Sequence, residues 1–349
     1  MRRRGRAGIW IILIVLIVIA AGIGYGWNAM QPTATSDQVV PYTLKSGTSK
    51  STVAEELAQN GLIKNALAFK VYLKLNSEGS EFKAGDYEFT PGLTYAQIIT
   101  KLNNADVVVP KTMKFTIPEG YTVTQIADKL SEAGFVDRDA FMKLVDDPSS
   151  MKLAQELKVP TGDGILHPLE GYLFPATYDL PIESTESDII ANMLLATRTK
   201  LRSIDNLDAQ LKERNLTVHQ LLTEASLVER EVVVPEERAQ VAGVIDNRLK
   251  QNMKLQIDAT VQYALGKQKA RLLYSDLKID SPYNTYLHEG LPPGPIANPG
   301  LDAIKATLAP EASKYLYYVT KKDGTGGHLF AQTYQEHLKN IETSKSTAK

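Results

Sequence analysis

The sequence predicts an α+β fold that follows a single membrane-spanning helix. Three observations lead to this prediction: an apolar run near the N-terminus, an internal repeat of strand and helix patterns in the first half, and strongly helical segments in the second half, of which residues 217–231 are the clearest. A length of 349 residues is enough for two or three domains. Hydrophobic residues make up 43% of the chain and charged residues 23%, which is typical of a folded globular protein.

The apolar run, GIWIILIVLIVIAAGIGYGW, extends over residues 8–27 and follows a cluster of Arg2, Arg3, Arg4 and Arg6. About 20 such residues cross a bilayer as a helix, and the arginine cluster keeps the N-terminus in the cytoplasm. The small residues AAG at 20–22 also permit cleavage as a signal peptide, but the length of the run favours an uncleaved anchor. We therefore expect a cytoplasmic tail over residues 1–7, a membrane anchor over residues 8–28, and the rest of the chain outside the cytoplasm.

Charge and cysteine content exclude several classes of partner and site. The chain has 39 Lys and Arg residues against 40 Asp and Glu residues, and four of the basic residues form the N-terminal cluster, so the remainder has a net charge of −5. A net-acidic chain without another Lys/Arg-rich run is not typical of a nucleic-acid-binding protein. The absence of cysteine excludes disulfides, cysteine–zinc sites and thiol catalysis.

An internal repeat follows a short polar linker over residues 29–41. YTLKSGTSKSTVAEELAQNGLI, from Tyr42, resembles FTIPEGYTVTQIADKLSEAGFV, from Phe115. Each copy predicts a short strand, a glycine turn and an amphipathic helix that ends at a glycine. Each is followed by a second shared pattern of glycine, aromatic strand, proline turn and helix, which begins at Gly85 and at Gly171. We assign residues 42–185 to this repeat region, which suits a binding or spacer module better than a catalytic cleft.

The remaining elements predict a second α+β domain over residues 186–345, followed by a tail over residues 346–349. We expect an amphipathic helix over residues 184–202, and Pro235 suits the first turn of another helix that continues to Lys250. Residues 281–300, SPYNTYLHEGLPPGPIANPG, are too rich in proline and glycine for a helix or a central strand, and they predict an ordered loop or the wall of a groove. A strand at residues 315–319, a turn and a closing helix complete the chain.

The helix predicted over residues 217–231 carries three glutamates with different expected environments. Its apolar residues recur at helical spacing and define one buried stripe: Val218, Leu221, Leu222, Ala225 and Val228. At about 100° per residue, Glu229 lies roughly 45° from the centre of this stripe, whereas Glu224 and Glu231 lie roughly 95–115° away, toward solvent. Leu227 is the one apolar residue outside the stripe. A carboxyl group in an apolar environment has a raised pKa, as a general acid requires. The competing interpretation is an ion pair between Glu229 and an arginine such as Arg238.

Motifs for other chemistries are absent from the sequence. The five histidines lack metal-ligand spacing, so we expect no metal site. No GxSxG motif is present for a serine nucleophile, and no glycine-rich phosphate loop is present for a nucleotide cofactor. What remains is carboxylate chemistry assisted by polar and aromatic side chains, which is typical of sites that cleave glycans.

The chain resembles the MltG/YceG-like family of endolytic murein transglycosylases, which are bacterial inner-membrane enzymes. The resemblance extends over nearly the whole chain. Its most specific stretches are LEGYLFPATY (residues 169–178), ASLVERE (225–231), NRL (247–249), LQIDATVQYALG (255–266), YNTYLHEGLPPGPIANPG (283–300) and GGHLF (326–330). The chain departs from the family pattern at Ala176, where the family usually has Asp, and at Ala259, where it usually has Pro. These departures argue against an acidic role at position 176 and leave the other motifs intact.

The resemblance implies that Glu229 is the single catalytic acid/base and that no cofactor is needed. Family members cut the β-1,4 bond between N-acetylmuramic acid and N-acetylglucosamine in nascent peptidoglycan strands, leave 1,6-anhydromuramic acid ends and so terminate strand elongation. The resemblance also implies a LysM-like module in the repeat region and a catalytic domain in which a helix carries the active-site glutamate. It further implies an inner-membrane location with the catalytic domain in the periplasm, and peptidoglycan synthases of the same membrane as partners.

Further residues on the matched motifs are candidates for binding the sugar or orienting Glu229: Asn247, Asp258, Tyr283, Asn284, Tyr286 and Glu170. For Asp258 the alternative is an N-cap of the following helix, and for Glu170 it is a buried structural role. His328 is interpreted as a hydrogen-bonded loop histidine and not as an acid or base.

The residues leave two other functions open. A peptidoglycan-binding or division-scaffold protein would keep the fold without the reaction. A glycoside hydrolase with two carboxylates would need Glu170 or Asp258 at about 5–9.5 Å from Glu229.

Overall fold

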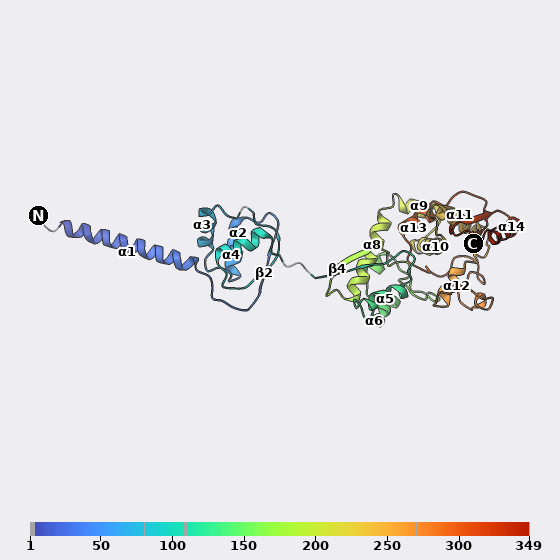
Figure 1. The fold of residues 1–349 in the computed structure, drawn as a ribbon, viewed down its shortest axis with the longest axis horizontal. Helices are drawn as coiled ribbons and strands as arrows, with labels where there is room; N and C mark the ends of the chain where they lie inside the picture. The colour runs from blue at the N-terminus through green and yellow to red at the C-terminus, as the bar shows by residue number, and fades with distance from the viewer. Residues whose placement is uncertain (1–3, 80, 108–110, 270, 349) are drawn as a thin grey trace. The chain divides into compact units, whose positions relative to one another are not determined.

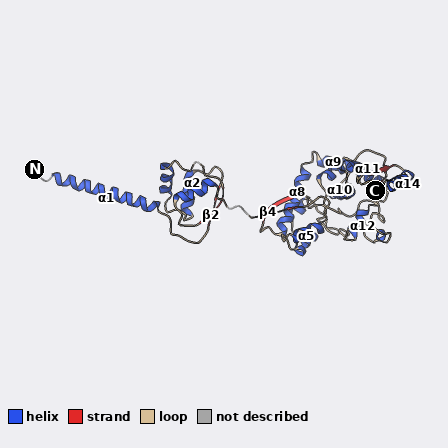
Figure 2. Ribbon diagram, in the orientation of Figure 1, coloured by secondary structure: helices blue, strands red, loops and turns tan. Residues whose placement is uncertain are grey.

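The computed structural model describes residues 4–79, 81–107, 111–269 and 271–348, and the chain divides into two compact units, Met1–Pro110 and Lys111–Lys349. Helices predominate and the strands are short (Figure 2). This mixture of helices and strands confirms the predicted α+β class.

The first unit consists of α1 (Arg4–Met30), β1 (Val40–Leu44), α2 (Lys50–Gln59), α3 (Ala66–Leu75), β2 (Gly85–Phe89) and α4 (Tyr95–Asn104). Within α1, the stretch from Leu13 to Met30 has a mean hydropathy of 1.9 and is long and apolar enough to cross a membrane. The helix is therefore compatible with the predicted anchor. Arg2 and Arg3 of the predicted tail lie outside the described residues.

The second unit consists of β3 (Thr112–Thr116), α5 (Val123–Glu132), α6 (Arg138–Asp146), α7 (Lys152–Glu156), β4 (Thr177–Pro181), α8 (Glu186–Arg202), α9 (Leu207–Arg214), α10 (Val218–Glu231), the 3-10 turn η1 (Pro235–Glu237), α11 (Arg238–Lys250), α12 (Asp258–Ala264), the 3-10 turn η2 (Asp276–Lys278), α13 (Leu301–Leu308), β5 (Tyr317–Thr320), β6 (His328–Ala331) and α14 (Tyr334–Ser346). Figure 1 shows α10 among α9, α11 and α13, and contacts join α10 to α11, α12 and α13.

The internal repeat is visible as two similar substructures, one in each unit. β1 pairs with β2 and β3 pairs with β4, both antiparallel, so that Tyr42 faces Tyr87 in the first copy and Phe115 faces Tyr178 in the second. A polar side chain caps the first helix of each copy, through Ser49 for α2 and Thr122 for α5.

The strand of the second copy differs in position from the prediction. The sequence predicted a strand directly after Gly171, whereas β4 begins at Thr177 and residues 168–172 form turns. The physical reason lies in tertiary hydrogen bonds, because the Leu173 N–H is bonded to the side chain of Asn298 (2.9 Å) and not to a neighbouring strand.

The second copy of the repeat shares its hydrophobic core with later helices. Residues of β3, α5 and α8 form one cluster with Leu221, Leu222 and Ala225 of α10. A second cluster joins Leu227 and Val228 of α10 to residues of α11, α12 and the 283–300 loop. The division between units therefore falls after Pro110, whereas the sequence analysis placed the boundary between residues 185 and 186. Helix α10 lies between the two clusters.

Candidate active site

Helix α10 is buried on every side over most of its length. Thr217 begins it with a capping box to Gln220, as expected of a strong helix start. The eight consecutive residues from 221 to 228 are all buried. Leu227, predicted to lie outside the buried stripe, is fully buried in the cluster with α11 and α12. A helix between two core clusters buries both faces, and a single-stripe pattern cannot describe it.

Glu224 and Glu231 are not the solvated neighbours that the periodicity predicted. Glu224 is fully buried, with its carboxylate 3.5 Å from the Arg214 guanidinium. Glu231 is partly buried and accepts a hydrogen bond from the Tyr318 hydroxyl (2.9 Å). Burial raises the pKa of each carboxyl group to about 7. The prediction was wrong because the elements on the far side of α10 cover the face that a lone helix would expose.

Glu229 lies in the last turn of α10, with 8% of its side-chain surface exposed. Its Oε2 accepts a hydrogen bond from the backbone N–H of Gly300 (3.0 Å), and its Oε1 is 4.0 Å from the Arg238 guanidinium. Gly300 is the N-cap residue of α13, so the carboxyl group faces the N-terminal end of that helix. Burial raises the pKa of Glu229 above its ordinary value, and the negative charge of Glu119 raises this pKa further. The hydrogen bond from Gly300 acts in the opposite direction and lowers it.

Glu119 is an acid beside Glu229 that the sequence analysis did not single out. It comes from the second repeat copy, where it occupies the position of Ser46 in the first. Its exposed side chain lies against Gly300, because a Cβ at position 300 would overlap the Glu119 carboxylate. Because Gly300 has no side chain, the Glu119 carboxylate can lie beside the residue whose N–H binds Glu229. The copies also differ at neighbouring positions, such as Lys45 against Pro118, so comparing the copies does not by itself single out Glu119.

Glu170 is fully buried and connects two distant segments. Its carboxyl oxygens accept hydrogen bonds from the Val123 N–H at the start of α5 (3.2 Å) and from Nδ2 of Asn298 (3.0 Å). Asn298, which the sequence analysis quoted only within a motif, also donates to the Tyr121 carbonyl (2.9 Å). Burial raises the pKa of Glu170 to about 8, against the lowering effect of its donors. The pair therefore ties the 283–300 loop to the second repeat copy.

Three other candidate residues hold backbone segments in place. Nδ2 of Asn247 donates to the carbonyls of Ser313 and Tyr315, both at 2.9 Å. Tyr283 and Asn284 are fully buried in the 283–300 loop. Nδ2 of Asn284 donates to two backbone carbonyls in the segment before the loop, at 2.9 and 3.0 Å. The Tyr283 hydroxyl accepts a hydrogen bond from the Leu166 N–H (3.4 Å), so the contacts of Tyr283 and Asn284 fix the loop, whereas those of Asn247 fix residues 313–315.

Asp258 and Tyr286 lie nearer the surface. Asp258 is exposed and accepts a hydrogen bond from the Tyr286 hydroxyl (2.6 Å). The N-cap residue of α12 is Ile257, and Asp258 is the first residue of the helix. The N-cap interpretation of Asp258 is therefore wrong, because its carboxylate is bonded to the tyrosine and not to the helix backbone.

His328 is hydrogen-bonded, as predicted, although it lies in strand β6 and not in a loop. Its Nδ1 is 2.6 Å from Oε2 of Glu237, and its backbone N–H donates to both oxygens of that carboxylate. In the described part of the chain, no group of three or more His, Cys, Asp or Glu side chains is arranged to hold a metal ion.

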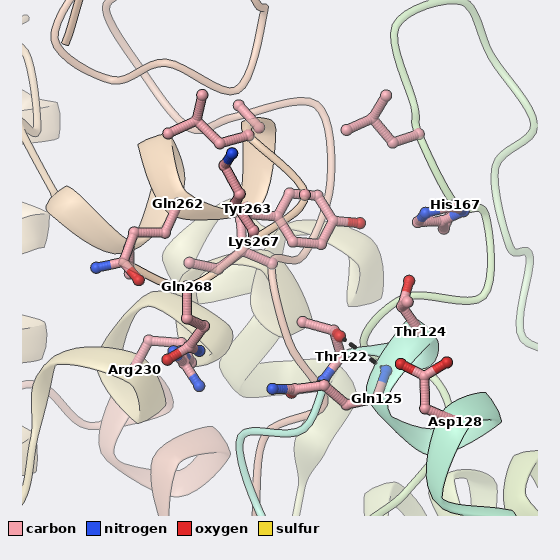
Figure 3. Close-up of a pocket in the computed structure, with 16 residues that line it drawn as sticks. Thr122, Thr124, Gln125, Asp128, His167, Arg230, Gln262, Tyr263, Lys267 and Gln268 are labelled. Atoms are coloured by element: carbon pink, nitrogen blue, oxygen red, sulfur yellow. Dashed lines mark hydrogen bonds between the residues drawn. The ribbon is translucent and has the colours of Figure 1, made fainter. Parts of the chain in front are cut away.

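A cavity of about 330 Å³ lies beside Arg230, the residue that follows Glu229 (Figure 3). Its walls come from the start of α5, the loop at His167, and α12 with the residues after it. Glu229 itself does not line this cavity. Gly120 lies between the cavity and Glu229. Its carbonyl accepts a hydrogen bond from Arg230 (3.1 Å), and a Cβ on Gly120 would lie 3.7 Å from Cγ of Glu229.

Comparison with known proteins identifies relatives over nearly the whole chain. The model of the YceG-like family matches residues 42–343. The endolytic murein transglycosylase of Bacillus subtilis is 38% identical over 334 residues, which cover 93% of this chain and 91% of the relative. The endolytic murein transglycosylase of Streptococcus pneumoniae serotype 2 is 32% identical over 356 residues, and the match covers 94% of this chain but 63% of that longer protein. A crystal structure of a YceG-like protein from Listeria monocytogenes has a TM-score of 0.60 at 37% identity, covering 87% of this chain and 99% of that one.

Proposed function

The chain belongs to the YceG-like family, and from this premise we propose that it is an endolytic murein transglycosylase with Glu229 as its catalytic residue. The observation that carries the assignment is the environment of Glu229. Its carboxyl group is almost fully covered, has a raised pKa, and lies on a rigid buried helix in a chain related to murein transglycosylases. A covered carboxyl group retains its proton near neutral pH more readily than a solvated one, which suits a general acid.

The proposed reaction needs one carboxyl group acting twice. Protonated Glu229 donates its proton to the oxygen that leaves with N-acetylglucosamine as the bond from C1 of muramic acid breaks. The C6 hydroxyl of the same muramic acid then attacks C1, and the Glu229 carboxylate accepts the hydroxyl proton. The nucleophile belongs to the substrate, so proximity replaces an enzyme nucleophile or a bound water. The product is a 1,6-anhydromuramic acid end, which terminates the strand.

The environment of Glu170 supports a lone acid/base over a hydrolase that uses Glu229 and Glu170 as its two carboxylates. Glu170 is fully buried and occupied by its donors, so it does not reach a sugar. Asp258 is bonded to Tyr286. Glu119 is exposed beside Gly300, and we assign it the electrostatic role of keeping Glu229 protonated.

The remaining parts of the chain fit a membrane-attached enzyme. We assign α1 as an inner-membrane anchor with the N-terminus in the cytoplasm, and Lys111–Lys349 as the periplasmic catalytic unit, in which α10 is the active-site helix. The strand–helix–helix–strand arrangement between β1 and β2, with its own hydrophobic core, supports a LysM-like glycan-binding module in the first unit. Synthases of the same membrane, which supply nascent strands, are the proposed partners.

Product analysis tests this function. Full-length protein in detergent is incubated with peptidoglycan strands, and the soluble products are identified by mass. We expect anhydromuramic acid ends, and a loss of at least about 100-fold in rate for Glu229→Gln. Glu236→Gln, at an exposed acid in η1, is the matched control and should retain full activity. Reducing muramic acid ends would identify a hydrolase, and strand binding without any soluble product would identify a scaffold protein.

A further inference from the structure

The cavity beside Arg230 has two facing walls with different chemistry. Figure 3 shows Arg230, Gln262 and Gln268 on one side, and Thr124, Gln125 and Asp128 of the α5 segment on the other. Apolar residues, among them Leu166 and Ile296, complete the lining. A volume of about 330 Å³ is within the range of pockets that bind small ligands.

The charged side chains of this pocket that lack an ion-pair partner are positive. Asp128 forms an ion pair with Arg138 (2.6 Å), and Nδ1 of His167 is bonded to Asp146 (2.7 Å), so both groups have partners outside the pocket. Arg230 and the exposed Lys267 form no ion pair within 4.0 Å among the residues that the structure describes. Arg230 does donate a hydrogen bond to the Gly120 carbonyl (3.1 Å), but two cations without a carboxylate partner within that distance favour an anionic ligand over a neutral sugar ring.

The pocket also offers hydrogen-bonding groups suited to a peptide. In the described ranges of the chain, the side chains of Thr124, Gln262 and Gln268 form no intramolecular hydrogen bond. Amide and hydroxyl groups both donate and accept, which matches the alternating N–H and C=O groups of a peptide backbone.

The pocket is close enough to Glu229 to receive a substituent of the sugar that reacts. Arg230 follows Glu229 in the chain and is hydrogen-bonded to Gly120, and a Cβ on Gly120 would lie 3.7 Å from Cγ of Glu229. In peptidoglycan the carboxylates belong to the stem peptide, which is attached through a lactyl ether to C3 of muramic acid. A muramic acid with its C1 at Glu229 would therefore carry an acidic peptide chain beside the reacting carbon.

Resting on the proposed function, we propose that this Arg230–Lys267 pocket binds the acidic stem peptide of the muramic acid at the cleavage site. The enzyme would then recognise strands whose peptides are still attached and act less well on strands from which amidases have removed them. Arg230 and Lys267 bind carboxylates, and the glutamines and Thr124 bind the peptide amides.

Binding to an inactive chain tests the pocket separately from catalysis. In full-length Glu229→Gln protein, we measure by calorimetry the affinity for a disaccharide tripeptide and for the same disaccharide without peptide. We expect the peptide-bearing ligand to bind more tightly, and Lys267→Glu to weaken its binding about threefold to tenfold, the size expected when an exposed charge is reversed. The affinity for the bare disaccharide should not change. Lys322→Glu, at an exposed lysine that does not line the pocket, is the control.

Activity measurements then separate the two proposals. Lys267→Glu should lower kcat/KM about threefold to tenfold on strands with stem peptides and leave kcat/KM on amidase-treated strands unchanged. Equal losses of kcat/KM on both substrates, or equal affinity of both ligands for the inactive chain, would contradict stem-peptide binding in the pocket. Anhydromuramic acid ends from the wild type would still support the transglycosylase activity. If binding depends on the peptide and on Lys267 but the wild type forms no anhydromuramic acid ends, the proposed transglycosylase activity is contradicted and stem-peptide binding is supported.

Discussion

Replacing Glu170 by glutamine should change how the stability of the protein depends on pH. The carboxyl group is fully buried, and burial raises its pKa from 4.5 to about 8. The folded state therefore holds a proton that the unfolded chain releases above about pH 4.5. The stability from this group is fully present below that pH and is lost as the pH rises through about 8. Glutamine does not ionise, so the variant does not lose this stability as the pH rises.

The size of the effect follows from the two pKa values. A tenfold change in proton affinity, which is one pKa unit, corresponds to a free-energy difference of about 1.4 kcal/mol. Between about pH 5 and about pH 9, the free energy of unfolding of the wild type should therefore fall by about 4 kcal/mol more than that of Glu170→Gln. Near pH 5 the two proteins should have similar stability, because the amide resembles the protonated acid and can still accept from the Val123 N–H.

Urea unfolding at several pH values measures this difference. Both tryptophans, Trp10 and Trp27, lie in α1, so their fluorescence does not report on the second unit, and far-UV circular dichroism is the suitable signal. All other titrating groups are common to both proteins and cancel in the comparison. A difference that stays constant from about pH 5 to about pH 9 would refute the reasoning, since it would mean that Glu170 does not titrate there.

Two further perturbations address the other acids around α10. Arg214→Met removes the cation that buried Glu224 shares with Asp246 (3.1 Å), and we expect the free energy of unfolding to fall by about 3 kcal/mol near pH 9. The loss should be smaller near pH 5, where Glu224 is protonated because its pKa is about 7 and only the Asp246 pair is still removed. An equal loss at both pH values, measured in urea, would contradict a role for the ion pair. Glu119→Gln removes a charge that raises the pKa of Glu229, so the high-pH limb of the kcat/KM profile should move to lower pH. Glu289→Gln, at an exposed acid, is the control, and an unmoved limb would remove Glu119 from its electrostatic role.

Local sequence signals predicted the elements that carry the site. The helix predicted over residues 217–231 is α10 (Val218–Glu231), because a capping box and helical periodicity are both local properties. The repeat predicted strands and helices in both copies for the same reason, whereas the antiparallel pairing of β1 with β2 and of β3 with β4 is seen only in the tertiary structure. The start of β4 was misplaced, because a hydrogen bond from Leu173 to Asn298, 125 residues away, replaces local strand pairing.

By itself, the sequence determined the α+β class, the apolar N-terminal helix, the repeat, the family and the choice of Glu229 as the residue to test. Only the tertiary structure decided the environment of that residue. Periodicity describes one face of an isolated helix, but α10 lies between two core clusters, so Glu224 is buried and Glu231 is partly buried as well. Gly300 and Glu119 reach Glu229 from segments 71 and 110 residues away. Such contacts depend on how loops pack against the helix, which no local pattern along the chain encodes.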